Sequence, residues 1–270
     1  MSAAAEQALA ALDRSPQRRA RRWRLAAVLA LVLGFYAVCW QLAGVDLAKL
    51  ATGLPKLGRW LASAWPPVWT ELPTFLLRTA ETVAMAAIGT TAAVLLAVPM
   101  AVLAARNTTP WPRAVAPARL LLNALRGIDS FVFALLFVAA VGLGPFAGVL
   151  GIALHTWGSA AKNFADHLEN QPMEAFEAVR STGAGRTTAL VYAMLPDVLP
   201  VGLSTALFWW EFNVRASTVL GVVGAGGIGQ ELKSSMDLLD FPRLFTIIVI
   251  IIVVVTLLDR FSGWLRQRFT

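Results

Sequence analysis

The stretch Leu244–Trp264 reads LFTIIVIIIVVVTLLDRFSGW, and its first charged residue is Asp259. A helix needs about 20 predominantly apolar residues to cross the hydrocarbon core of a membrane, so this stretch predicts a membrane-spanning helix. The rest of the chain has the same character: 57% of its 270 residues are hydrophobic and 14% are charged. That composition is far from the average of soluble domains and indicates a protein embedded in a membrane.

Further apolar runs predict a total of six spans, and thus an all-α membrane protein. The other five are about Leu25–Leu42, Thr79–Ala104, Leu120–Val141, Pro145–Ala161 and Ala189–Trp210. The run from Pro145 is short, so we expect it to be tilted, re-entrant or shielded by its neighbours. The first run follows the Arg-rich segment 14–24, but it is longer than the core of a signal peptide and no clear cleavage site follows it. We therefore expect a cytoplasmic arm over residues 1–20 and one transmembrane domain over residues 21–270.

The basic residues predict how the chain is oriented. If the N-terminus lies inside the cell, 16 of the 23 Lys and Arg residues fall in segments on the inner side. The positive-inside rule then predicts that both termini and the loop 162–188 are cytoplasmic. The net charge of +7 is explained by this distribution, so it does not indicate a nucleic-acid partner.

A motif lies in that loop. It runs Glu177-Ala178-Val179, then Gly183, and twelve residues later Leu195-Pro196. The pattern resembles the EAA loop of ABC importer permeases, with Val179 and Ala193 replacing the family's Ala and Ile. The resemblance implies a helix that docks into an ATPase subunit and transmits its closure to the spans, through Phe176, Glu177, Ala178, Gly183, Leu195 and Pro196.

The residues of the loop also support a short helix by themselves. Glu174 suits a first helical turn, and Gly183 can adopt the left-handed conformation that ends a helix. Met173, Phe176 and Val179 recur on one face of it. Such an amphipathic helix can lie on lipid or dock in a groove of a partner, and the pattern does not decide between the two.

A second cluster contains charged residues and glycines near the predicted end of the fifth span. Charged residues at membrane depth face the bundle interior and pair, and repeated glycines allow close packing and hinges around a pathway. Arg215 can guide an anion or hold Glu211 in an ion pair, and Arg126 beside Asp129 raises the same two alternatives. The candidate path and gate residues are Glu211, Asn213, Arg215, Gly224, Gly226, Gly227, Gly229 and Arg126.

This cluster resembles the phosphonate permeases of the PhnE family, which carry Trp-Glu-x-Asn-x-Arg ahead of Gly-x-Gly-Gly-Ile-Gly. The residues that match are Trp210, Glu211, Asn213, Arg215 and the glycines from Gly224 to Gly229. The resemblance implies a type I ABC importer permease with MetI-like architecture. Its cargo would be a phosphorus oxyanion, such as phosphonate, phosphite or phosphate. The run Gly224 to Gly229 also fits a dinucleotide-binding pattern, which we reject because apolar spans flank it and no βαβ unit is expected.

The resemblance further implies a set of partners in a bacterial plasma membrane. These are a second copy of the permease, two cytoplasmic ATPase subunits and an extracytoplasmic solute-binding protein. The sequence has no P-loop, so ATP and Mg²⁺ would be bound by the ATPase. His155, His167 and Cys39 have no metal-ligand spacing, and we expect no metal, no cofactor and no catalytic residue in this chain. The alternatives are a similar permease for methionine, a quaternary amine or another small solute, and, from another class, a membrane enzyme or standalone channel.

Overall fold

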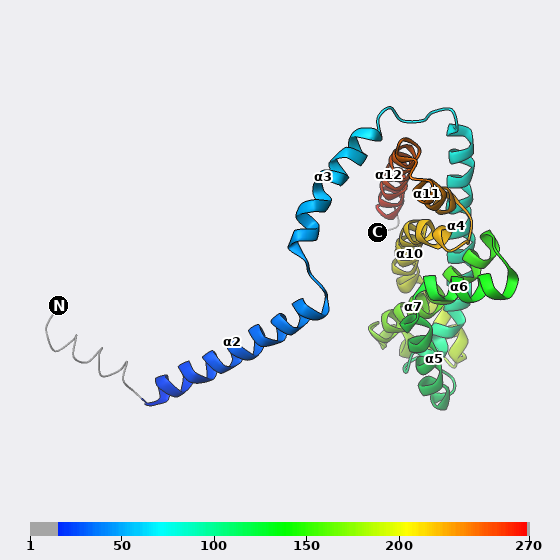
Figure 1. Ribbon diagram of the computed structural model, residues 1–270. Coiled ribbons are helices and arrows are strands. Elements are labelled where there is room, and N and C mark those ends of the chain that lie inside the picture. Colours follow the sequence, from blue (N-terminus) through cyan, green and yellow to red (C-terminus); the bar gives the residue numbers. More distant parts are fainter. Residues whose placement is uncertain (1–15, 269–270) are drawn as a thin grey trace, which may run out of the picture. The chain divides into compact units, whose positions relative to one another are not determined.

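The computed structural model describes residues 16–268, and this part of the chain forms helices and no strands, as predicted. Figure 1 shows these helices in chain order by colour. The α-helices are α2 (Pro16–Leu42), α3 (Leu47–Ser63), α4 (Leu72–Ala104), α5 (Val115–Gly127), α6 (Ser130–Val141), α7 (Pro145–Glu169), α8 (Glu174–Ser181), α9 (Arg186–Ala189), α10 (Leu195–Val222), α11 (Ile228–Asp237) and α12 (Phe241–Arg266). A 3-10 turn, Pro112–Ala114, precedes α5, and a π turn, Leu190–Met194, precedes α10. The predicted N-terminal arm lies mostly outside the described residues, and its last five residues already belong to α2.

The described part of the chain divides into two compact units, with the division between Arg59 and Trp60. In the first unit, α2 contains a segment, Trp23–Leu42, that is long and apolar enough to cross a membrane. The helix α3 follows it and was not predicted. Its leucines recur every three or four residues, while Lys49, Lys56 and Arg59 occupy the opposite face. Long apolar runs in the sequence do not reveal α3, because the polar residues of one face interrupt the apolar residues of the other.

The second unit is a bundle in which α7 packs against α4, α5, α6 and α10. Small residues allow the close approach: a Cβ atom on Gly151 would lie 2.8 Å from the backbone nitrogen of Ala134, and one on Gly158 would lie 2.6 Å from Leu125 Cβ. α7 contains the short predicted span, Pro145–Ala161, and continues to Glu169. Of the three possibilities for this span, the packing of α7 supports shielding by neighbouring helices.

Four helical segments of the described chain are long and apolar enough to span a membrane, and a fifth is obtained if α5 and α6 form one bent span. The predicted span Leu120–Val141 is therefore wrong as a single straight helix. α5 and α6 meet at an angle of 86°. The break has a local cause, because the Asp129 carboxylate accepts a hydrogen bond from the Phe131 N–H and so caps a new helix.

The span predicted to end at Trp210 also needs correction. The helical path runs from Arg186 through the π turn to Val222, which is 37 residues. Pro196 explains the π turn, since it has no N–H to donate to the carbonyl four residues earlier and its ring crowds that carbonyl. Glu211, Asn213 and Arg215 consequently lie inside α10 rather than near its end.

Candidate coupling segment and translocation path

The short helix predicted in the loop 162–188 is present as α8. We call residues 168–186, which contain α8, the coupling segment, after the role predicted for this loop. Phe176 is buried in a hydrophobic core formed by the chain's own helices, and Met173 and Val179 pack against the same core. Most of the apolar face of α8 therefore packs on the chain's own helices, an arrangement that the sequence pattern did not predict. The side chains exposed on α8 include Glu174, Glu177 and Ala178. These polar and small residues form the surface of α8 that is available to a partner.

Gly183 follows the end of α8 in the left-handed conformation, as predicted, with φ of +86°. Its N–H donates to the Arg180 carbonyl, 3.1 Å away. A Cβ atom built on Gly183 would meet nothing within 4 Å. The requirement for glycine is thus conformational and does not come from crowding.

Asn213, a candidate path residue, lies in the interior of the bundle. It is fully buried and joins three helices: its Nδ2 donates to Thr90 Oγ1 of α4 at 2.8 Å and to Thr156 Oγ1 of α7 at 2.9 Å. Such bonds hold helices together in an apolar surrounding. The sequence pattern did not identify the two threonines, because only the packing of α4, α7 and α10 brings them together.

Glu211 belongs to an ion-pair network between α10 and α12. Its carboxylate accepts from Arg266 Nη2 at 2.5 Å and lies 3.3 Å from Arg215 Nη2. Arg215 Nη1 is 3.8 Å from Asp259 as well. The pair between Glu211 and Arg215 was one of the two predicted alternatives, whereas Arg266 and Asp259 were not foreseen.

Arg126 is not part of this network. Its side chain is exposed at the end of α5, and the described residues provide no ion pair for it. The neighbouring Asp129 instead caps α6. The structure therefore does not bring Arg126 together with the other candidate path residues.

The glycine cluster forms a tight turn between α10 and α11. Gly224, Gly226 and Gly227 all have positive φ values, of 93°, 78° and 71°. The turn lies against α4, where Thr82 Oγ1 accepts a hydrogen bond from the Ile228 N–H at 2.8 Å. A Cβ atom on Gly229 would overlap the Thr218 carbonyl oxygen. The close backbone approach predicted for this cluster is confirmed.

An ionic cluster that sequence reasoning missed lies beside this turn. Glu231 of α11 accepts from Arg243 of α12 at 2.7 Å and lies 3.5 Å from Arg78 of α4. Arg78 also pairs with Glu81 at 2.9 Å, and Arg243 with Glu71 at 3.0 Å. The cluster holds the beginnings of α4 and α12 against α11.

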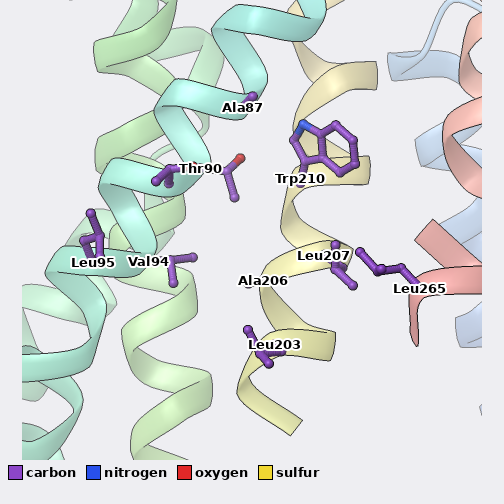
Figure 2. A pocket seen from close by; sticks show the side chains of 10 residues that line it. Ala87, Thr90, Val94, Leu95, Leu203, Ala206, Leu207, Trp210 and Leu265 are labelled. Carbon is purple, nitrogen blue, oxygen red and sulfur yellow. The ribbon is translucent and has the colours of Figure 1, made fainter. Parts of the chain in front are cut away.

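A cavity of about 410 Å³ opens between α4 and α10 (Figure 2). Thr90, Val94 and Leu95 line it from α4, while Leu203 and Trp210 line it from α10. The Trp210 indole N–H is buried and has no hydrogen-bond partner among the described residues. The cavity is otherwise mainly apolar.

A second cavity of about 260 Å³ continues the first toward α8. The two share Val94, Leu203 and Ala206, and the second extends to Leu168 and Leu195. Together they form a groove between α4 and α10, which we call the α4–α10 groove. Leu195, predicted as a coupling residue, lines the end of this groove that is nearer to α8.

Comparison with known proteins identifies the family to which this helical bundle belongs. Residues 97–270 match the family described as binding-protein-dependent transport system inner membrane component. The chain belongs to this family. Its members and the relatives below are transport permease subunits, not enzymes, which removes the alternative of a membrane enzyme.

Two curated relatives of this permease come from Stutzerimonas stutzeri. The putative phosphite transport system permease protein HtxC is 44% identical over 247 residues, which are 92% of this chain and 88% of the relative. The phosphite transport system permease protein PtxC is 40% identical over 248 residues, or 92% and 90% of the two chains. The match therefore extends over almost the whole of each protein.

A solved structure supports the predicted architecture. The MetNI methionine ABC transporter in an inward-facing conformation has a chain that matches the permease with a TM-score of 0.65 and 20% identity. The match covers 75% of this permease and 100% of that chain. The permease thus has the fold of a type I ABC importer subunit, whose family implies an ATPase and a solute-binding protein as partners.

Proposed function

We propose that this permease imports a phosphorus oxyanion such as phosphite, phosphonate or phosphate. The observation that carries the transport role is the family match over residues 97–270, and the α4–α10 groove, which ends near the coupling segment, is the candidate path. The cargo assignment is supported by the likeness to two phosphite permeases over nine tenths of the chain. The stretch from Trp210 to Gly229, which resembles phosphonate permeases, supports the same class of cargo.

The proposed assembly contains two copies of the permease, two ATPase subunits and a solute-binding protein in a bacterial plasma membrane. The ATPase would receive the exposed face of α8, which carries Glu174, Glu177 and Ala178. ATP-driven closure brings the two α8 helices together and opens the path outward, and release of the nucleotide products opens it inward. ATP and Mg²⁺ belong to the ATPase subunits.

The charge distribution supports an orientation in which α8 and both termini are cytoplasmic. The turn Gly224–Gly229 then lies at the outer end of the bundle, where it acts as a gate next to the binding protein. Its contact with Thr82 supports this role, because a shift of α4 must move the turn as well. Rigid packing of this kind favours two discrete positions over continuous deformation.

Arg215 pairs with Glu211 and Asp259, and we propose that its main role is to join α10 to α12. Its side chain is nevertheless 47% exposed, which leaves guanidinium donors available to water or an anion. The substitution Arg215→Gln separates this pairing role from the guidance of an anion.

Uptake into proteoliposomes tests the cargo. The permease is reconstituted with its ATPase and binding protein, and ATP-dependent accumulation of radiolabelled phosphite, methylphosphonate and phosphate is measured. We expect at least one of them to accumulate with ATP and none with a non-hydrolysable ATP analogue. Accumulation of methionine or glycine betaine in place of all three would contradict the proposal.

A further inference from the structure

The turn that follows α4, residues 105–111, contacts both ends of the coupling segment. On the side where the segment begins, Asn107 Nδ2 donates to the Leu168 carbonyl at 2.7 Å and lies 3.5 Å from Met173 Sδ. On the side where it ends, Arg186 Nη2 donates to the Asn107 carbonyl at 3.0 Å. A single residue thus joins the chain before α8 to the chain after it.

A second set of contacts fixes the same turn. Glu169 accepts from the Arg106 N–H at 2.6 Å and from Arg119 Nη2 at 2.5 Å, and Arg119 Nε donates to the Ala104 carbonyl at 2.9 Å. Burial of Glu169 favours its neutral form, but these donors outweigh burial and lower the pKa of its carboxyl below the ordinary value. The carboxylate is therefore charged near neutral pH and keeps both contacts.

The turn is packed against the rest of the bundle. Ala105, Thr108 and Thr109 are buried, although they belong to a connection between helices. Asn107 Oδ1 is also buried, and no hydrogen-bond partner for it is found within residues 16–268. Buried acceptors without a partner are uncommon. This one can accept a further hydrogen bond when the coupling segment changes position.

We propose that the turn 105–111 is the clasp through which the coupling segment moves α4, with Asn107 as its positioning residue. This inference rests on the proposed transport function. The clasp is continuous with α4, whose Thr90, Thr91 and Val94 line the α4–α10 groove. Displacement of α8 by the ATPase then shifts the wall of the groove directly. α7 moves with α4, because the two pack along their lengths and Trp157 Nε1 donates to the Leu96 carbonyl.

Fluorescence of a bimane label at position 91 tests whether the clasp transmits movement. Cys39, the single cysteine, is replaced by Ser and Thr91 by Cys in the full complex with the ATPase. Trp210 lines the same cavity from α10 and quenches bimane on contact, so the signal reports movement of α4 relative to α10. We expect ATP to change the fluorescence, whatever solute is transported.

Two variants act on opposite sides of the clasp. Asn107→Ala removes the contacts of the amide, and Arg186→Gln removes the donor to the Asn107 carbonyl. In both we expect the ATP response, and uptake per ATP hydrolysed, to fall about tenfold, within the range usual for coupling between sites. The basal rate of ATP hydrolysis should be retained, since neither residue is part of the ATPase. Asn123→Ala, at an exposed position of α5, is the matched control.

The outcomes separate the clasp from the proposed function. The clasp proposal would be overturned by an ATP response that persists in Asn107→Ala and Arg186→Gln. It would also be overturned if the labelled complex with neither substitution showed no ATP response. If Asn107→Ala does not assemble, Arg186→Gln decides the question by itself. A normal ATP response without uptake of any phosphorus oxyanion would refute the proposed cargo and leave the clasp intact.

Discussion

Replacing Asn213 by Ala should destabilise the bundle and leave the choice of cargo unchanged. The substitution removes the hydrogen bonds of 2.8 and 2.9 Å to Thr90 and Thr156. Interhelical bonds in membranes contribute about 0.6 kcal/mol each, and the cavity left by the shortened side chain costs about 1 kcal/mol. The sum is about 2 kcal/mol, which corresponds to a fall in Tm of about 4–8 °C for a chain of this size.

Thermal unfolding of the detergent-solubilised permease, followed by size-exclusion chromatography after heating, measures this fall. Asn123→Ala is the control, since an exposed asparagine should change stability by less than about 0.5 kcal/mol. Adding Thr156→Val to Asn213→Ala should lower stability by less than the sum of the two single changes, because they remove the same bond. An unchanged Tm in Asn213→Ala together with altered cargo selectivity would refute the structural role and return Asn213 to the path.

Four further predictions concern the coupling segment and the ion pairs. Phe176→Ala should lower the amount of folded permease, with a cost of about 3 kcal/mol or more, because the ring is buried in the chain's own core; quantitative membrane blotting checks this. Gly183→Ala should lower the stability of the permease by about 1–2 kcal/mol, because alanine is strained at a positive φ, and should uncouple ATP hydrolysis from uptake. Gly183→Asn should retain more uptake, because asparagine tolerates this backbone conformation better. Equal uptake in the two variants would contradict the requirement for a left-handed residue. If the role of Arg215 is to pair with Glu211, Arg215→Gln should lower Tm by a few degrees and leave the KM for uptake unchanged. A KM raised about tenfold would instead show that Arg215 guides the anion. Glu169→Gln should lower Tm by an amount that is constant between about pH 6 and 8 and vanishes under acid conditions.

The direction of the pH effect follows from the lowered pKa of Glu169. A carboxyl with a lowered pKa in the folded state stabilises that state fully above its unfolded value, ordinarily 4.5. The contribution is lost as the pH falls through the lower, folded pKa. A difference between the wild type and Glu169→Gln that grows on acidification would contradict the charged contacts with Arg106 and Arg119.

The break between α5 and α6 could not be predicted from hydropathy. The run from Leu120 to Val141 is apolar enough to be one span, and a sum over a window does not register a single residue such as Asp129 that can cap a new helix. For α10, by contrast, the sequence predicted an end to the helix where there is none. Glu211 and Arg215 suggested that the span had ended, but their charges are paired within the bundle and the helix continues to Val222.

The sequence by itself determined that the chain is helical and membrane-embedded, because long apolar runs and basic loops are local properties. It also located α8 and the left-handed Gly183, since both depend on residues next to each other in the chain. Only the tertiary structure decided that Phe176 faces the chain's own core and that Asn213 joins Thr90 to Thr156. The physical reason is that buried polar groups and ion pairs take their partners from other helices, and those partners depend on how the helices cross.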